Sequence, residues 1–226
     1  MIFESMLILR NTLYVLLIIF AIILFYIFVL LKIIRKIHQF PIPAFAVRII
    51  DNPIRRRFIQ KPDLIADRMK LEPGMKVLEI GPGKGTYTKA VAKQILPDGM
   101  VYAIDIQESI IEKLKDRVKE ENISNILPKV DDAYNLSFED ESIDRIFTVA
   151  CLPEIPDPVK VLEEFKRVLK KDGLISLSEL FIDPDYPLRR TEKKWAKKAG
   201  LTLIQQFGNF FSYQLNFGKD SLSTLD

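Results

Sequence analysis

The stretch Val77-Leu78-Glu79-Ile80-Gly81-Pro82-Gly83-Lys84-Gly85 decides the fold of this 226-residue chain. The apolar run from Val77 to Ile80 predicts a strand buried in a parallel sheet. The glycines that follow let the backbone turn tightly and approach a ligand where a Cβ would collide. Because the residues from Thr86 onward are expected to be helical, the loop also presents a helix N-terminus. This order of strand, glycine-rich turn and helix favours an enzyme that binds a nucleotide-like cofactor.

The spacing of the glycines separates this loop from that of dinucleotide-binding enzymes. Their fingerprint is G-x-G-x-x-G, in which the helix N-terminus faces a pyrophosphate. Here the glycines alternate as G-x-G-x-G, and an acid stands two residues before the first of them. The whole motif, E-x-G-x-G-x-G, resembles the first motif of class I S-adenosylmethionine-dependent methyltransferases. The resemblance implies S-adenosylmethionine as the cofactor and, as its first binding residues, Glu79, Gly81, Pro82, Gly83 and Gly85.

Two acids at the ends of later strands match the same family. The run from Val101 to Asp105 predicts a second strand, which ends in an acid about 20 residues past the glycine loop, where a carboxylate accepts hydrogen bonds from a ribose diol. The resemblance places Asp105 and the adjacent Ile106 in the cofactor site. It also equates Asp132 and Ala133 with the family's acid-Ala pair after the third strand. Asp132 would then accept from the adenine amino group, and Ala133 would leave room for the ring.

Two longer runs extend the resemblance, which covers about residues 62 to 217. The stretch from Leu136 to Asp144 is similar to the family's L-P-F-x-D-x-S-F-D run, and that from Val161 to Gly173 is similar to its E-x-x-R-V-L-K-P-G-G helix and turn. Each feature alone is ambiguous, because a glycine-rich turn also serves NAD enzymes and an acid that ends a strand is often a solvated cap. Asp131 and Asp172 depart from the family's usual residues. The motifs favour small-molecule and lipid-type relatives, which include quinone-biosynthesis enzymes.

The rest of the chain alternates helices and strands as a doubly wound domain does. Further helices are expected near 87–95, from about 109, around 159–169 and over 191–199, and further strands over 143–150 and 174–180. Alternating residues over 211–217, after a turn at Gly208-Asn209, predict a terminal hairpin. The expected fold class is α/β, a Rossmann-like seven-stranded and mostly parallel sheet. The resemblance implies that its last strand is antiparallel and inserted beside the fifth.

Residues on the acceptor side are harder to assign from sequence. Methyl transfer needs above all an acceptor atom held in line, about 3 to 3.5 Å from the methyl carbon. A phenol or neutral amine also needs a base, whereas an ionised thiol or enolate does not. Glu179 is the preferred catalytic carboxylate because it ends the fifth strand, at the edge where α/β sheets bind ligands. Glu154, after the fourth strand, is the second candidate, and either acid has a structural or solvated role as its alternative.

Other patterns disfavour particular substrates and sites. The segment after the fourth strand lacks N-P-P-Y, which in the family holds the planar amino groups of nucleic acids and proteins. Cys151 has no nearby histidine to activate it, so nucleophilic catalysis by its thiol is not expected. His38 has no Cys or His partner at ligand spacing, and no metal site is expected. The family's segments before the first strand often close over the substrate, which suggests such a role for 55–60.

A second major signal lies near the N-terminus. The run from Asn11 to Leu31 carries no charge, and it is long enough to cross a hydrocarbon core as a helix. It continues into Lys32-Ile33-Ile34-Arg35-Lys36 without a small-residue cleavage site, which favours a retained anchor over a signal peptide. A buried or interfacial helix is the alternative. We expect a transmembrane anchor helix in residues 1–38, a basic interfacial linker over 39–61 and the methyltransferase domain over 62–226.

Basic residues follow the apolar run in what we term the basic collar, residues 32–57. The collar holds seven Lys or Arg, whereas Arg10 and the terminal amine precede the run and are offset by Glu4. The positive-inside rule then places the C-terminal domain of a single-pass membrane protein in the cytoplasm. Because the net positive charge comes from the collar and residues 58–226 are net negative, we expect contact with membrane lipids and no nucleic acid. Setting the topology is the alternative role of these charges.

These features together predict a membrane-anchored methyltransferase that acts on a lipid or other hydrophobic small molecule at the cytoplasmic face. An anchor raises the effective concentration of a substrate dissolved in the same bilayer. The enzymatic alternative is methylation of a thiol or a protein. The non-enzymatic alternative is a degenerate fold that binds the cofactor as a scaffold, which the acids Glu79, Asp105 and Asp132 disfavour.

Overall fold

The computed structural model of the chain describes residues 2–37, 53 and 55–219. They belong to two compact units, Met1–Gln39 and Phe40–Asp226. His38 and most of the predicted linker, 39–52 and 54, lie outside the described residues.

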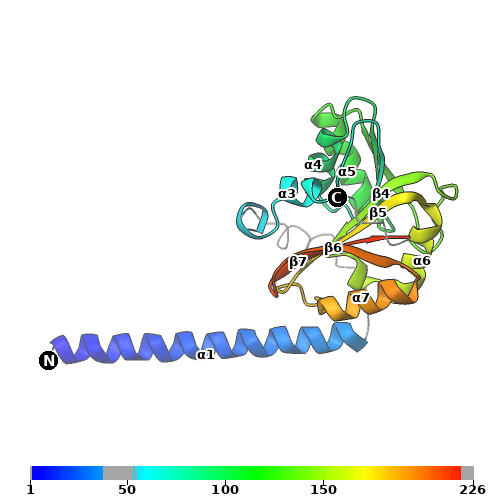
Figure 1. Cartoon of the computed structure of the whole chain (residues 1–226). Coiled ribbons are helices and arrows are strands. Elements are labelled where there is room, and N and C mark those ends of the chain that lie inside the picture. The colour runs from blue at the N-terminus through cyan, green and yellow to red at the C-terminus, as the bar shows by residue number, and fades with distance from the viewer. Residues whose placement is uncertain (1, 38–52, 54, 220–226) are drawn as a thin grey trace. The chain divides into compact units, whose positions relative to one another are not determined.

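The first unit is a single helix, α1 (Ile2–Ile37), drawn in blue in Figure 1. Its apolar part, Met6–Ile34, has 29 residues, and none of its most apolar window, with mean hydropathy 3.2, is buried. At 1.5 Å per residue this part is about 44 Å long, more than the roughly 30 Å of a bilayer's hydrocarbon core. Length and composition therefore make α1 a candidate membrane span.

The second unit is built on one seven-stranded sheet in the order β3-β2-β1-β4-β5-β7-β6. The strands are β1 (Lys76–Ile80), β2 (Met100–Asp105), β3 (Ile126–Val130), β4 (Ile143–Val149), β5 (Leu169–Leu180), β6 (Thr202–Gly208) and β7 (Ser212–Gly218). The first five strands are parallel, and β7 runs antiparallel between β5 and β6. The predicted Rossmann-like sheet, mostly parallel with an antiparallel last strand beside the fifth, is confirmed.

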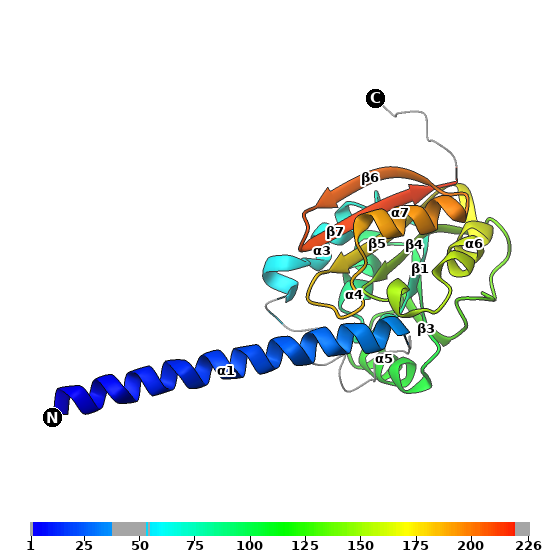
Figure 2. The same cartoon turned by 90° about the horizontal axis from the view of Figure 1, so that it is seen from below.

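Helices cover both faces of this sheet (Figure 2). They are η1 (Arg55–Ile59), α3 (Pro62–Asp67), α4 (Thr86–Gln94), α5 (Glu108–Glu120), η2 (Leu152–Glu154), α6 (Pro158–Val168) and α7 (Arg189–Lys198). Successive residues of β1 enter opposite cores, because side chains alternate along a strand. Val77 packs with residues of α3 and α4, whereas Leu78 packs with Leu162 and Phe165 of α6.

The alternating residues of β7 do not divide into a core face and a solvent face. Gln214 and Asn216 are as buried as the alternating apolar residues Tyr213, Leu215 and Phe217. The amide of Gln214 donates to the carbonyl of Ile65 at 3.1 Å, and that of Asn216 donates to the carbonyl of Arg68 at 2.7 Å. These carbonyls end α3 and would otherwise lack partners. The polar face of β7 therefore holds α3 against the sheet.

The order of the strands places the functional edge of the sheet. The chain runs from β1 outward to β2 and β3, and then returns to β4 on the other side of β1. Ligands of open α/β sheets bind at such a reversal, outside the carboxyl ends of the strands. The glycine loop, residues 81–85, follows β1 at this point.

Candidate cofactor and acceptor site

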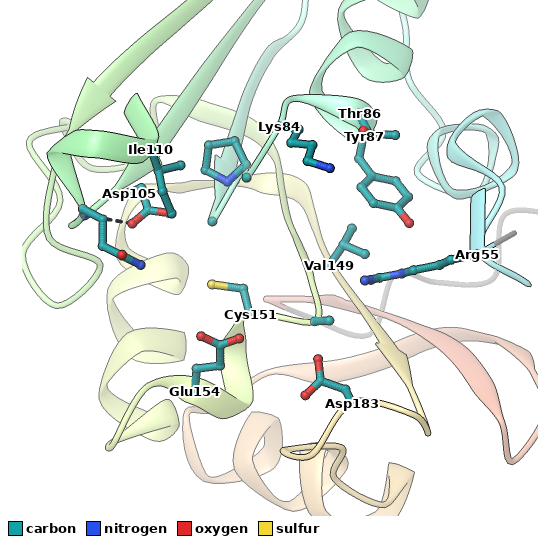
Figure 3. A pocket seen from close by; sticks show the side chains of 15 residues that line it. Arg55, Lys84, Thr86, Tyr87, Asp105, Ile110, Val149, Cys151, Glu154 and Asp183 are labelled. Atoms are coloured by element: carbon teal, nitrogen blue, oxygen red, sulfur yellow. Dashed lines mark hydrogen bonds between the residues drawn. The ribbon is translucent and has the colours of Figure 1, made fainter. Parts of the chain in front are cut away.

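A cleft lies at this reversal, and its volume is about 650 Å³ with the solvent at its mouth included. The glycine loop, the end of β2, the turn after β4, η1 and the loop after β5 all contribute to its wall. Figure 3 shows Asp105 at one end and Arg55 with Asp183 at the other, with Cys151 and Glu154 between them.

The glycine loop forms the floor of the cleft near β1. Gly81, Pro82 and Gly83 line the cleft, and Gly81 has a φ of +72°, which L side chains rarely adopt. A Cβ at Gly81 would lie 2.5 Å from the Cys151 sulfur. Gly85 has a different place, because it precedes the first turn of α4 and a Cβ there would meet Leu114 of α5 at 2.5 Å.

Asp105 ends β2 and lines the cleft beside this loop. Its carboxylate accepts a hydrogen bond from the Gln107 amide at 2.8 Å. Burial raises the pKa of Asp105, while the amides of Gln107 and Ile106 counteract the rise. The Ile106 side chain is exposed, and only the backbone of this residue interacts with the Asp105 carboxylate. The arrangement holds one carboxylate in a fixed position at the end of β2.

Asp132 and Ala133 lie in the turn after β3 and are not part of the cleft wall as it stands. The carboxylate of Asp132 is exposed and accepts a hydrogen bond from the Tyr134 amide at 2.9 Å. Its neighbour Asp131 is bound to Ser137 and, at 3.2 Å, to Lys129. These bonds outweigh burial and lower the pKa of Asp131. Asp131 therefore fixes the shape of the turn.

Glu79 is buried in β1 behind the glycine loop and does not line the cleft. Burial raises the pKa of Glu79 to about 8, and the Thr88 hydroxyl partly offsets the effect. Thr88 belongs to α4, so Glu79 lies close to the helix that follows the loop. Its position suits support of the loop from beneath.

The end of the cleft opposite Asp105 is formed by Glu154 of η2, Asp183 and Arg55. We term it the acceptor end, because Glu154 is the residue that the sequence predicts on the acceptor side. Asp183 is nearly fully buried, and it accepts a hydrogen bond from the Asp185 amide at 3.0 Å. Cys151 lies beside Glu154 (Figure 3). Burial and the surrounding carboxylates raise the pKa of the Cys151 thiol well above its ordinary value. Cys151 is therefore a neutral thiol at physiological pH.

Two buried acids lie together behind this end of the cleft. Glu179 of β5 and Glu192 of α7 have no exposed surface, and Glu179 does not line the cleft. Burial raises the pKa of Glu192 to about 8. Burial, followed by the charges of Glu192 and Asp183, raises the pKa of Glu179, and Arg55 opposes the rise. Because two like charges cannot both ionise cheaply in such a place, the pair retains a proton at neutral pH.

The segment before α3 is bound to the domain at the same end. The side-chain amide of Gln60 donates to the Glu179 carbonyl at 3.1 Å, and Arg55 donates to the Gln60 side chain at 2.7 Å. The Tyr87 hydroxyl donates to the Gln60 carbonyl at 3.3 Å. Arg55 and Gln60 are both buried. Residues 55–60, which the sequence suggested as a cover for the substrate, thus reach the acceptor end of the cleft.

Comparison with known proteins decides the class of this site. Residues 71–213 match a family model described as a methyltransferase domain. The chain belongs to this methyltransferase family. The methyltransferase is 29% identical over 120 residues to demethylmenaquinone methyltransferase from Geobacillus sp. (strain WCH70), an alignment that covers 53% of this chain and 51% of that protein. It is 36% identical over 113 residues to the ubiquinone/menaquinone biosynthesis C-methyltransferase UbiE from Bordetella avium, covering 50% and 43%.

The methyltransferase therefore spans about half the length of these two curated relatives. Among solved structures it is similar to a SAM-dependent methyltransferase from Aquifex aeolicus, with a TM-score of 0.73 and 22% identity. That match covers 78% of this chain and 98% of the other. It confirms the fold of a class I methyltransferase, and S-adenosylmethionine is the cofactor of this class.

The residues of the methyltransferase fit this cofactor. The Gly81–Gly83 loop lines the cleft without bulky side chains, and Asp105 brings a largely buried carboxylate to the end of β2. When bound, S-adenosylmethionine supplies an electrophilic methyl group. Of the residues predicted from sequence, the cleft brings together Gly81, Pro82, Gly83, Asp105 and Glu154. It does not bring Glu79, Gly85, Ile106, Asp132, Ala133 or Glu179 into its wall.

Sequence reasoning missed Asp183 and Glu192 at the acceptor end. A signal for Glu192 was present in α7, where it is the one acid among six Lys or Arg. It also shares a helix face with Trp195, Ala196 and Ala199, because residues three, four and seven apart lie on one side. An acid on the apolar face of a basic helix indicates burial. Asp183 carried no such signal, since its place depends on the path of the loop after β5.

Proposed function

We propose that this methyltransferase is anchored in a membrane and methylates a lipid or other hydrophobic small molecule at the cytoplasmic face. One observation carries the proposal: an unburied apolar stretch of 29 residues belongs to the same chain as the methyltransferase cleft. The named activity of the quinone methyltransferases among its relatives supports a hydrophobic small-molecule substrate. The basic collar supports the cytoplasmic orientation of the domain and an interaction with anionic lipids.

The proposed cofactor half of the site combines the glycine loop with the acids after β2 and β3. Asp105 is to accept hydrogen bonds from the ribose, and the Gly81–Gly83 backbone is to make room for the amino-acid tail. Asp132 is proposed to accept a hydrogen bond from the adenine amino group, and Ala133 to leave room for the adenine ring. Glu79 is assigned a supporting role beneath the loop, because it is buried against α4 and does not line the cleft.

The proposed acceptor half uses Glu154 and Glu179 in different ways. Glu154 lines the cleft, so it is assigned direct removal of the acceptor's proton where the acceptor is a phenol or neutral amine. Glu179 lies behind Asp183 and shares a buried environment with Glu192. It is assigned the role of balancing the charges of Asp183 and Arg55, which line the cleft. An ionised acceptor would need positioning alone.

The proposal is tested by following the methyl group. The full chain, reconstituted in vesicles made from the source membrane's lipids, is incubated with methyl-labelled S-adenosylmethionine. The products are then separated into organic-extractable molecules, water-soluble thiols and protein. We expect the label in the organic-extractable pool, and Asp105→Ala to reduce that labelling when S-adenosylmethionine is not saturating. Label confined to protein or to soluble thiols would overturn the substrate class.

Anchoring is tested separately from the chemistry. The membranes are washed with alkaline carbonate, which removes peripheral proteins, and sealed vesicles are treated with protease from either side. A spanning α1 predicts that the chain stays with the membrane and that the domain is cleaved only from the cytoplasmic side. Release of the intact chain by carbonate would contradict the anchor. It would not count against the methyltransferase activity, which the labelling experiment tests.

A further inference from the structure

Exposed aromatic residues gather where β5 and the terminal hairpin meet. Phe210 and Phe211 form the turn between β6 and β7, and they are 53% and 63% exposed. Their rings pack on Phe181 after β5, with centroids 5.1 and 5.9 Å away. Tyr186 completes the cluster, and its hydroxyl donates to the Phe210 carbonyl. The rings support one another, so this surface is a packed platform and not a loose loop.

Further apolar side chains extend this platform. Ile182 is 69% exposed, and Phe58 and Ile59 of η1 are 70% and 47% exposed. The bond from Gln60 to the Glu179 carbonyl holds η1 to the end of β5. Figures 1 and 2 agree that η1, the β6–β7 turn and the loop after β5 lie at the same end of the domain. We term these exposed side chains the aromatic platform: Phe58, Ile59, Ile182, Phe210 and Phe211.

The platform adjoins the acceptor end of the cleft. Ile182 precedes Asp183, which lines the cleft, and η1 contributes Arg55 to the same wall. Large exposed apolar patches on soluble domains mark sites of protein or membrane interaction. A surface that docks through this platform would therefore lie next to the entrance for the acceptor.

The charges around the platform indicate which surface it meets. Helix α7 follows the platform's loop and holds six Lys or Arg, while its one acid, Glu192, is buried. Its outward residues Arg190, Lys194 and Lys197 are exposed. Arg57 lies 5.9 Å from the ring centroid of Phe58. Aromatic side chains interleaved with cations are the composition of proteins that rest on an anionic bilayer interface.

We propose that the methyltransferase domain docks on the anionic bilayer surface through the aromatic platform, with the basic face of α7 on the headgroups. Cations near such a surface are attracted to the anionic headgroups, and the aromatic rings enter the headgroup region. Docking presents the acceptor end of the cleft to molecules within the bilayer. This inference rests on the proposed membrane location, and it adds a second contact that is independent of α1.

The test places a fluorescent probe on the platform of the full chain. In a Trp195→Phe background, Phe211→Trp puts the probe in the β6–β7 turn, and Leu127→Trp puts a matched probe on β3 at the opposite edge of the sheet, where Leu127 is 49% exposed. Both proteins are reconstituted with lipids brominated near the headgroup. We expect the Phe211→Trp probe to lose most of its emission and the Leu127→Trp probe to keep it. Equal quenching of both probes would overturn the proposal.

A second variant tests the charges. Combined Arg190→Glu, Lys194→Glu and Lys197→Glu substitutions should restore the emission of the Phe211→Trp probe, as should replacing anionic by zwitterionic lipid. A blue shift that depends on protein concentration, without quenching by brominated lipid, would identify a second copy or another protein as the partner and overturn the lipid assignment. Carbonate extraction of the same samples reports on α1, so a failure of docking is distinguishable from a failure of anchoring.

Discussion

The two halves of the cleft differ in how the chain builds them. The cofactor half comes from short segments that directly follow β1 and β2, and its geometry is set by backbone conformation and one carboxylate. The acceptor half joins residues from η1, η2 and the loop after β5, which are far apart in sequence. Two fully buried acids, Glu179 and Glu192, lie behind it. The cofactor half is therefore formed by residues that are close together in the sequence. The acceptor half forms only when distant elements pack against one another.

The largest effect is expected at Gly81 in the cofactor half. Gly81→Ala forces an L side chain to a φ of +72° with its Cβ 2.5 Å from the Cys151 sulfur. Left-handed strain alone costs about 1–2 kcal/mol, and the collision adds to it, so the affinity for S-adenosylmethionine should fall by roughly 100-fold. Gly74→Ala is the matched control, because Gly74 has a φ of +84° and nothing within 4 Å of the added Cβ. Calorimetric titration should show normal affinity for the control.

The next effect is expected in the acceptor half. Glu154→Gln keeps the size of the side chain and removes its basicity, so kcat should fall by about 100-fold with a phenolic or amine acceptor. The KM for S-adenosylmethionine should stay unchanged, because Glu154 belongs to the other half of the cleft. Steady-state rates with varied cofactor separate the two constants. An unchanged kcat would remove Glu154 from the proton's path and favour an acceptor that is already ionised.

The third effect is a loss of affinity for S-adenosylmethionine when Asp105 in the cofactor half is replaced. Asp105→Ala removes a carboxylate acceptor whose hydrogen bonds are each worth about 1.5–3 kcal/mol. We expect a 10-fold or greater loss of cofactor affinity, about 1.4 kcal/mol or more, measured by calorimetry. Asp116→Ala, on the exposed side of α5, is the control for loss of an acid. Unchanged affinity in Asp105→Ala would exclude this residue from the site.

The sequence predicted the fold in detail, and it predicted Gly81, Pro82, Gly83 and Asp105, which line the cleft. The cofactor roles of Glu79, Gly85, Ile106, Asp132 and Ala133, which lie outside the cleft wall, stay predictions. Buried strands, glycines at positive φ and an acid at a strand end each leave a local pattern in the sequence. The acceptor half leaves little of this kind, because Arg55, Asp183 and Glu192 meet only after β5, η1 and α7 have packed. The same reason explains β7, where Gln214 and Asn216 alternate with apolar residues and are nevertheless buried against α3.

The smallest effect concerns the buried pair behind the acceptor half. The carboxyl of Glu192 has its ordinary pKa of about 4.5 in the unfolded chain, and burial raises this pKa to about 8 in the folded chain. The folded state therefore binds more protons, and the free energy of unfolding should fall as the pH rises from about 4.5 through about 8. Glu192→Gln should flatten this fall and make the protein more stable at pH values near 8.

This prediction is checked by urea unfolding at several pH values, followed by the fluorescence of Trp195 in α7. Glu163→Gln, an exposed acid of α6, is the matched control and should leave the pH dependence unchanged. If Glu192→Gln retains the full fall in stability, the pair does not store a proton. The burial of Glu179 and Glu192 would then need another explanation.

The claim that joins the anchor to the cleft can be tested in one measurement. Vesicles that carry the enzyme and acceptor lipids extracted from the source membrane are mixed with distinguishable vesicles that carry the same lipids without enzyme, and labelled S-adenosylmethionine is added. A tethered enzyme with a bilayer-dissolved substrate predicts that label enters the organic-extractable pool of the enzyme-bearing vesicles first. Equal rates of labelling in both populations would contradict the account.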